Sequence, residues 1–360
     1  MRDFACPSCG HQLAFENSLC LRCNTRIGFD PESVTLVAIV EDAQRPSDGE
    51  VPADAFRLCD NMHLARCNWI VRVDEDASGP ALCPSCALTR TRPTDDDTAA
   101  LDAFAEAEAA KRRLLVELTE LRLPVVSRDE DPESGLAFDL LSSRDRPVTT
   151  GHASGVITLD LAEGDDAHRE QLRVAMAEPY RTLLGHFRHE IGHYYQSVLV
   201  ASDESRARFV ELFGDPEEDY RAALDRYYAD GPVAGWADIH VSAYASMHPA
   251  EDWAETFAHY LHLRDTLDTA AEFGLAPART SLDRRRVEPG EFDRLIESWL
   301  PLAWSLNMLN RSMGRPDLYP FVLAPAVLDK MRFVHARIAD PPAPGGADPV
   351  SGRAEAASSR

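Results

Sequence analysis

The sequence has no long hydrophobic run and relatively little positive charge. Hydrophobic residues make up 44% of the 360, yet none of their stretches approaches the roughly 20 residues that a membrane-spanning helix needs. The first residues, MRDFACPSCG, lack the basic stretch and the apolar core of a secretory signal. We therefore expect a soluble, cytoplasmic protein without a membrane partner.

Basic residues are scarce relative to acidic ones, with 37 Lys and Arg against 60 Asp and Glu and a net charge of −23. Affinity for nucleic acid or anionic lipid depends on clustered Lys and Arg. The nearest candidate cluster, Arg284 to Arg286, is more typical of a solvated helix start than of a binding patch. Nucleic acid is therefore not an expected partner.

No cysteine follows residue 86, although the chain contains eight. Such segregation is typical of a separate cysteine-bearing module, and without an export signal metal ligation is favoured over disulfides. We predict a zinc-ribbon region over residues 1–92, a connecting helix at 97–123, a main domain at 124–338 and a disordered, Pro- and Gly-rich tail at 339–360.

Two sets of four cysteines are predicted to hold structural zinc, because four soft thiolates suit tetrahedral zinc and the metal supplies folding energy that so short a segment lacks. The first set consists of two CxxC pairs separated by ten residues: Cys6, Cys9, Cys20 and Cys23. The second is spaced by seven, fifteen and two residues: Cys59, Cys67, Cys83 and Cys86. His63 could replace Cys59 or Cys67, although an exposed loop histidine is the more frequent case. The ribbons could also bind a protein partner.

Helical spacing dominates the main domain, and two strands precede it. Leu136 to Leu141 and Val156 to Leu161 alternate apolar with other residues and are predicted to be strands. Helices are predicted over residues 166–176, 179–201, 203–213, 217–229, 249–266, 290–313 and 325–338. The fold class is therefore expected to be α+β, with a small β-rich zinc-ribbon region followed by a helix-rich domain.

The pentad HEIGH, at residues 189–193, is the candidate for a catalytic zinc site. On a helix His189 and His193 lie four residues apart on one face, so both imidazoles can reach one ion, with Glu190 beside them to handle protons. A hydrolytic zinc needs three protein ligands and an open position. Because HExxH also occurs by chance, a third ligand has to be found.

The third ligand is not supplied by a metzincin pattern, since Gln196 and Leu199 occupy the positions of its glycine and third histidine. The segment YASMHPAEDWAETFAHYLH, residues 244–262, offers two carboxylates instead. Glu251 and Glu255 are four residues apart and share a helical face, and Pro249 suits the first turn of that helix. Either glutamate could complete the site.

This arrangement resembles the glutamate-completed zincins, the gluzincins, and the spacing of Tyr244, Glu251, Glu255 and Phe257 is similar to that of the anthrax lethal factor type. The resemblance implies Glu251 as the third zinc ligand and Glu255 as a carboxylate that supports a zinc-bound histidine. It implies Tyr244 as the hydroxyl that stabilises the oxyanion. His240 or His248 is an alternative donor, although either is more typical of a surface position.

The whole chain resembles a bacterial family of zinc-binding metallopeptidases that carry an N-terminal zinc ribbon. Matching segments run from CPSCGHQLAFENSLCLRC through GVITLDL and EPYRTLLGHFRHEIGHYY to HPAEDWAETFAHYLH. The resemblance implies a zincin-like domain that hydrolyses peptide or protein substrates. A zinc-activated water would attack the peptide carbonyl, with Glu190 as general base and then acid. Val156 to Leu161 would be the sheet edge strand that pairs with the substrate.

Two other interpretations stay open. Glu190 and His193 also form ExxH, the di-iron signature of ferritin-like bundles, but that site requires a second ExxH, and Glu255 to His259 has one residue too many. His259 and His262 are more typical of the exposed part of a helix. The alternative function is a non-enzymatic zinc-ribbon adaptor with an inactive HExxH domain, although three ligands beside a base favour an enzyme.

Overall fold

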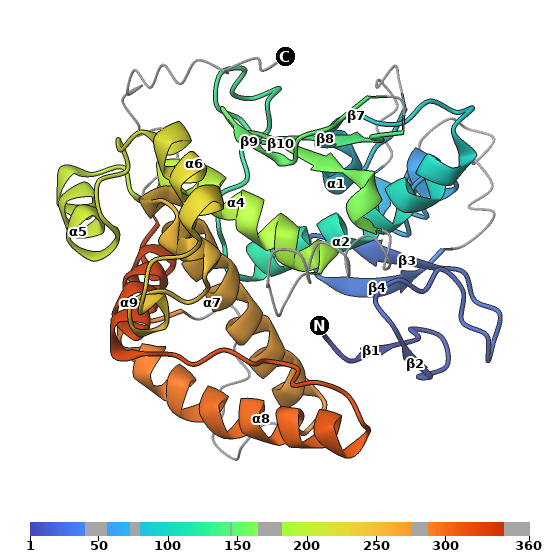
Figure 1. Cartoon of the computed structure of the whole chain (residues 1–360). Coiled ribbons are helices and arrows are strands. Elements are labelled where there is room, and N and C mark those ends of the chain that lie inside the picture. The colour runs from blue at the N-terminus through green and yellow to red at the C-terminus, as the bar shows by residue number, and fades with distance from the viewer. Residues whose placement is uncertain (40–55, 73–79, 145, 165–181, 276–286, 342–360) are drawn as a thin grey trace.

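The centre of the molecule is the crossing of two helices, α4 (Leu183–Leu199) and α7 (Pro249–Glu272). This computed structural model describes residues 1–39, 56–72, 80–144, 146–164, 182–275 and 287–341 (Figure 1). A Cβ placed on Gly192 of α4 would lie only 3.0 Å from the Cα of Ala254 in α7. The missing side chain of this glycine therefore lets the two backbones come close.

The cysteine-bearing region consists of short paired strands around a cluster of aromatic rings. Its antiparallel pairs are β1 (Phe4–Ala5) with β2 (Gln12–Leu13), β3 (Ile27–Asp30) with β4 (Thr35–Ala38), and β5 (Phe56–Leu58) with β6 (Ile70–Arg72). The ring centroid of Phe29 lies 4.8 Å from that of Phe15 and 5.2 Å from that of Trp69. Asn68 also donates a 2.8 Å hydrogen bond to the carbonyl of Phe15. The predicted β-rich N-terminal region is confirmed, and these contacts join its two halves.

The main sheet has four strands in the order β7 (Thr89–Thr91), β8 (Ala137–Leu141), β10 (Val156–Asp160) and β9 (Gly151–Ala153). β10 runs parallel to β8 and antiparallel to β9, so it is an internal strand. The expectation that Val156 to Leu161 forms the sheet edge is therefore wrong. Ser154 and Gly155, at φ 46° and 80°, make a tight turn that folds β9 back along β10.

Helices make up most of the rest, as predicted. Beyond α4 and α7 they are α1 (Pro84–Ala87), α2 (Thr98–Glu120), α5 (Asp203–Phe213), α6 (Tyr220–Asp230), α8 (Phe292–Ser312) and α9 (Pro325–Ala339). Single 3-10 turns are η1 (Asp60–Met62), η2 (Leu161–Gly164), η3 (Trp236–Asp238), η4 (Tyr244–Ser246) and η5 (Pro289–Glu291). The helix predicted over 166–176 and the cluster Arg284 to Arg286 lie outside the described residues.

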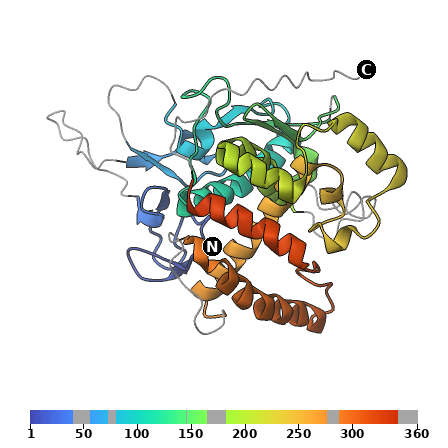
Figure 2. The same ribbon diagram turned by 90° about the vertical axis from the view of Figure 1, so that its left-hand side faces the viewer.

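The views in Figures 1 and 2 agree on how these parts are arranged. The N-terminal strands and the helices α5 and α6 lie at opposite ends of the molecule, with α4 and α7 between them. α8 packs along α7 on the side away from the main sheet. None of the described helices combines the length and the hydrophobicity that crossing a membrane requires.

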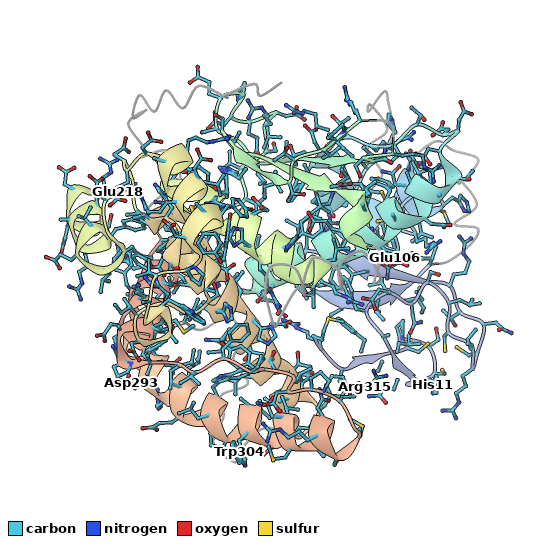
Figure 3. All side chains as sticks on the ribbon, in the orientation of Figure 1. His11, Glu106, Glu218, Asp293, Trp304 and Arg315 are labelled. Atoms are coloured by element: carbon cyan, nitrogen blue, oxygen red, sulfur yellow. The ribbon has the colours of Figure 1, made fainter. Side chains whose placement is uncertain are left out.

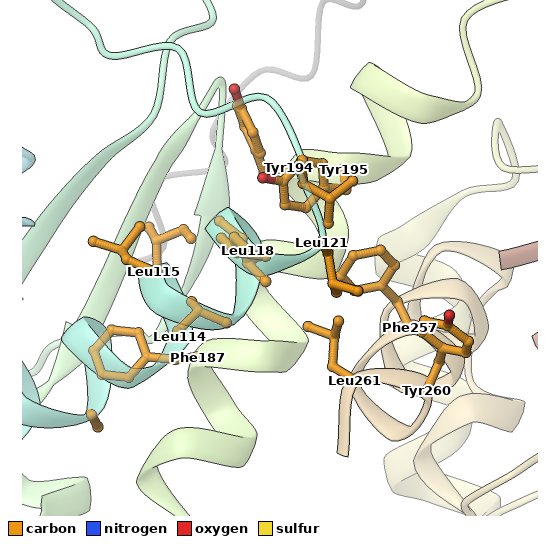
Figure 4. Close-up of a cluster of buried hydrophobic side chains, with 14 of the residues drawn as sticks. Leu114, Leu115, Leu118, Leu121, Phe187, Tyr194, Tyr195, Phe257, Tyr260 and Leu261 are labelled. Atoms are coloured by element: carbon orange, nitrogen blue, oxygen red, sulfur yellow. The ribbon is translucent and has the colours of Figure 1, made fainter. Parts of the chain in front are cut away.

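The hydrophobic core lies where α2, α4 and α7 meet (Figure 4). Its side chains are buried and come from all three helices: Leu114 and Leu118 of α2 with Leu121 just after its end, Phe187 and Tyr195 of α4, and Phe257, Tyr260 and Leu261 of α7. Removal of this apolar area from water is the main term that holds the helices together.

Buried ion pairs between the helices also determine how the helices lie against one another. Arg188 of α4 lies 3.0 Å from a carboxylate oxygen of Glu117 in α2 and 2.9 Å from one of Asp265 in α7. Burial works to raise the pKa of Glu117, and the positive charge of Arg188 beside it opposes that rise. Lys330 of α9 lies 2.5 Å from Asp252 in the first turn of α7. Breaking such a buried pair from one side is strongly destabilising.

Two histidines of α7 lie differently from the expectation. His259 is only 7% exposed, and its Nδ1 is 2.9 Å from the hydroxyl of Tyr319. The ring of His262 is stacked on the same tyrosine at 5.4 Å. The expectation that both are exposed is therefore wrong, because the connection between α8 and α9 packs against this part of α7.

Replacing Gly192 by valine should lower the free energy of unfolding by roughly 1–3 kcal/mol, because the added carbons push α4 away from Ala254. The loss is expected even though valine is the better helix former of the two. Chemical denaturation of the zinc-loaded protein measures it. Gly290→Ala is the control, since a Cβ there would meet no atom within 4 Å. Equal unfolding midpoints for Gly192→Val and the unaltered protein would contradict the close contact.

Candidate metal centres

Three polar side chains of the HEIGH pentad lie on one face of α4. His189 and His193 are one turn apart, with ring centroids separated by 5.0 Å, and Glu190 lies beside them. The helix begins after Thr182, whose side chain accepts a hydrogen bond from the backbone N–H of Gly185. Buried apolar side chains hold the other faces of the helix in place: Phe187, Ile191 and Tyr195.

The first turn of α7 brings Glu251 to these two histidines. One Glu251 oxygen lies 3.0 Å from Nε2 of His189 and the other 3.5 Å from Nε2 of His193. The three donor atoms lie within 4.8 Å of one another. Ligand atoms around a tetrahedral zinc are roughly 3.3 Å apart, given zinc–ligand bonds of roughly 2.0–2.1 Å. Two imidazoles and one carboxylate at these distances fit zinc.

The environment of Glu251 also fits a bound cation. This residue is 3% exposed, and apart from the 3.0 Å contact with Nε2 of His189 its Oε2 has no hydrogen-bonding partner among the described residues. Burial would raise the pKa of Glu251, but the neighbouring His193 and His189 hold that pKa well below its usual range. A buried carboxylate that stays ionised requires a compensating positive charge.

Glu255, one turn further along α7, lies behind His189 rather than among the three donor atoms. Its Oε1 is 2.7 Å from Nδ1 of His189, and its Oε2 accepts a 2.6 Å hydrogen bond from the hydroxyl of Ser242. Burial opposes ionisation of Glu255, yet the contact with His189 holds its pKa at about 2. Such a carboxylate orients the imidazole and leaves Nε2 free to face a metal.

Glu190 lies beside the donor atoms, and one oxygen of its buried carboxylate lacks a hydrogen-bonding partner among the described residues. The residue is 8% exposed, and its Oε2 has no hydrogen-bonding partner among the described residues. Burial raises the pKa of Glu190. A carboxylate whose pKa is raised toward neutrality is better suited to take up and release a proton.

Two tyrosines lie against the same group. Tyr244, in η4, has its ring centroid 6.1 Å from that of His189, and burial raises the pKa of its hydroxyl. Tyr220, in α6, donates a 3.0 Å hydrogen bond to Oε1 of Glu251. Tyr220 was not expected from the sequence. No motif connects it with Glu251, and only the folding of α6 against α7 brings the two together.

Two further histidines near the site were also missed. His152 of β9 is stacked on His193, with centroids 6.2 Å apart and 14° between the rings, and burial lowers its pKa to about 4. His186, one turn before His189 in α4, is paired with Glu163 of η2. Helical spacing from His189 could have pointed to His186. Nothing in the sequence relates His152 to the pentad.

The two histidines considered as alternative oxyanion donors have other contacts. Nδ1 of His248 accepts a 3.1 Å hydrogen bond from the N–H of Ala250, and its Nε2 donates one of 3.1 Å to the carbonyl of Glu218. At 4% exposure His248 is buried, so its expected surface position is wrong. His240 has its Nδ1 3.1 Å from the carboxylate of Asp252.

The eight cysteines form two groups of four, in the predicted sets. The sulfur atoms are 3.6 Å apart for Cys6 and Cys23 and 3.7 Å for Cys9 and Cys20. In the second group Cys67 and Cys83 are 3.6 Å apart. Sulfurs around a tetrahedral zinc are roughly 3.8 Å apart, given zinc–sulfur bonds of roughly 2.3 Å, whereas a disulfide requires about 2.05 Å. His63 is exposed, as expected, and outside the group.

Known proteins resemble the chain over almost its whole length. A family model described as "Putative zinc-binding metallo-peptidase" matches residues 100–337, and a zinc-ribbon domain model matches residues 3–97. The chain is 61% identical over 336 residues to proteins of Mycobacterium bovis and Mycobacterium tuberculosis, each described as uncharacterized. The alignments cover 93% of the chain and 94% of each relative. No solved structure matches the chain significantly.

Proposed function

The chain belongs to this family of zinc-binding metallopeptidases with an N-terminal zinc ribbon, and we propose that it is a zinc-dependent enzyme that hydrolyses peptide bonds. The observation that carries the proposal is the convergence of His189, His193 and Glu251 on one point, with the buried Glu190 beside them. These three side chains would hold the catalytic zinc. A structural zinc more commonly has four protein ligands and no adjacent base.

When bound, zinc acts as a Lewis acid that lowers the pKa of water and polarises a carbonyl oxygen. Glu190 is proposed to accept the proton of the attacking water and then to donate it to the leaving amine. Its burial and raised pKa support both roles, since the carboxylate must bind and release the proton in turn. Glu255 is a positioning residue, because it contacts His189 at Nδ1.

The two tyrosines are proposed to have different roles. Tyr244, whose buried hydroxyl has a raised pKa and therefore keeps its proton, would donate a hydrogen bond to the oxyanion. Tyr220 would hold Glu251 in place through its 3.0 Å hydrogen bond. The outer strand β9, rather than β10, would pair with an extended peptide, since β9 lies at the sheet edge and packs against α4.

The two cysteine groups are proposed to hold structural zinc and to leave a ribbon surface for a protein partner. The sulfur separations of 3.6 and 3.7 Å support thiolate coordination of a metal in both groups. Bound zinc would add stability to the short paired strands that carry the two groups.

Elemental analysis should find about three zinc ions per chain, of which one is exchangeable by a chelator. Glu251→Ala should lose that ion, because it removes a ligand, whereas Glu255→Ala should weaken its binding roughly 10–100-fold, as loss of an orienting group does. Glu204→Ala, at an exposed position of α5, is the control and should keep all ions. Two or fewer ions, or loss from Glu255→Ala but not from Glu251→Ala, would overturn the assignment.

Glu190→Gln should retain zinc and lose peptide hydrolysis by roughly 10²–10⁴-fold, since the amide cannot accept the proton. A proteome-wide search for new peptide termini, with the active enzyme and the variant in parallel, measures the loss and identifies substrates. Zinc content is the internal control. Equal sets of termini with both proteins would refute catalysis by Glu190 and leave the adaptor function.

Tyr244→Phe should lower kcat by roughly 10²-fold while leaving zinc affinity unchanged, because it removes a donor to the transition state. Tyr220→Phe should instead lower zinc affinity, because Glu251 loses a hydrogen bond. The measurements are kcat on a cleavable peptide and zinc affinity by chelator competition. Tyr228→Phe is the control, since this tyrosine is 65% exposed on the same helix as Tyr220. Unchanged kcat in Tyr244→Phe would remove it from the mechanism.

A further inference from the structure

The outer face of α8 carries apolar side chains that the rest of the described chain leaves exposed or only partly covered. Trp304 is 66% exposed and Leu300 is 54% exposed, and Met308 is half-buried one turn further on. Figure 3 shows Trp304 at the outer side of α8, with Asp293 and Arg315 toward its opposite ends. Exposed apolar groups of this kind, gathered on one face and bordered by charges, mark interaction surfaces.

These side chains form a regular stripe. At 3.6 residues per turn, the residues of this stripe that belong to the helix lie within about 80° of one another around the helix axis. They are Asp293, Glu297, Leu300, Trp304, Met308 and Arg311, and Arg315 follows just beyond the helix end. The opposite face of α8 is buried through Leu295, Trp299 and Leu302. The helix thus has one face in the protein core and a second, partly apolar face directed outward.

The stripe is complementary to itself when it is reversed. Glu297 and Arg311 lie seven residues on either side of Trp304, and Asp293 and Arg315 lie eleven on either side. Leu300 and Met308 lie four on either side. Two copies of α8 that cross antiparallel at Trp304 would therefore place Glu297 against Arg311 on both sides of the crossing and apolar against apolar in the middle. A parallel pair would place each charge against its own copy, which is unfavourable.

We propose that α8 is the contact of a twofold homodimer, in which the stripe of one copy packs against the stripe of a second. A twofold axis requires one surface that is self-complementary, and the charge order along α8 has this property. Antiparallel helices also bring the opposite ends of their dipoles together. The inference goes beyond the proposed function and does not depend on it.

The charges at the ends of the stripe are available for this contact. Glu297 and Arg315 make no ion pair with any residue of the described chain. Arg311 pairs with Asp317 at 2.5 Å, yet its side chain remains 58% exposed. Asp293 pairs with Arg332 and remains 74% exposed. Each can therefore accept a partner from a second copy without losing the first.

The small area of the α8 stripe limits the affinity that we expect for the proposed homodimer. One helix per subunit covers less than the roughly 800 Å² per partner of a standard interface. We therefore expect a dissociation constant in about the micromolar range, and the measurement must cover concentrations from about 1 to 100 µM.

Sedimentation velocity of the full, zinc-loaded chain tests the dimer. The unaltered protein should shift from monomer to dimer over that range, and Trp304→Glu should weaken association at least roughly tenfold. Leu309→Glu is the matched control, since Leu309 is an exposed apolar residue of α8, 57% accessible, but lies about 140° around the helix from Trp304. A monomer at every concentration, or equal association of Trp304→Glu and the unaltered protein, would overturn the proposal.

A charge exchange tests the antiparallel arrangement separately. Glu297→Arg alone and Arg311→Glu alone should each weaken self-association, because like charges then meet in the homodimer. An equimolar mixture of the two variants should restore it, since each arginine then faces a glutamate. A mixture that associates no better than either variant alone would contradict the antiparallel contact. Equal unfolding midpoints show that the variants remain folded.

Discussion

The close contact of α4 with α7 at Gly192 and Ala254 is the constraint on which the rest of the structure depends. The donor atoms of His189 and His193 come from one helix and those of Glu251 from another, and they must meet within a few ångströms. A larger side chain at the crossing would separate them. Trp253 secures this geometry, because its Nε1 donates a 2.8 Å hydrogen bond to the carbonyl of Gly192. The packing of α4 on α7 and the proposed metal site therefore depend on residues of the same short segments of the two helices.

The cysteine-bearing region is attached to this centre through α2. The hydrophobic core is continuous from the aromatic rings near the cysteines to the helices of the main domain. Lys111 and Glu108 of α2 form a fully buried ion pair at 2.7 Å, and the carboxylate of Glu108 lies 3.9 Å from the sulfur of Cys86. β7, which directly follows the second cysteine group, pairs with β8 of the main sheet. The region thus packs as a part of the whole rather than as an appendage.

Much of the fold and of the candidate centre could be predicted from local spacing. Cysteine pairs, the HEIGH pentad and helical periodicity involve residues close in sequence, so their geometry follows from one turn or one knuckle. The sheet edge could not be predicted. Which of two strands lies outermost depends on a two-residue turn at Ser154 and on pairing with β8, and alternation of apolar residues does not report strand order. The burial of His259 was missed because it depends on Tyr319, far along the chain.

The sequence by itself determined which residue types are available for zinc and which helix presents two of them. It left open whether Glu251 or Glu255 completes the proposed metal site, since both lie on one face of α7. Only the tertiary structure placed Glu251 beside both Nε2 atoms and Glu255 behind His189, because this depends on where α7 crosses α4. The same holds for Tyr220 and for the outward stripe of α8. Contacts between distant elements, and which helix face is left uncovered, depend on the packing of the whole chain, and no local pattern contains them.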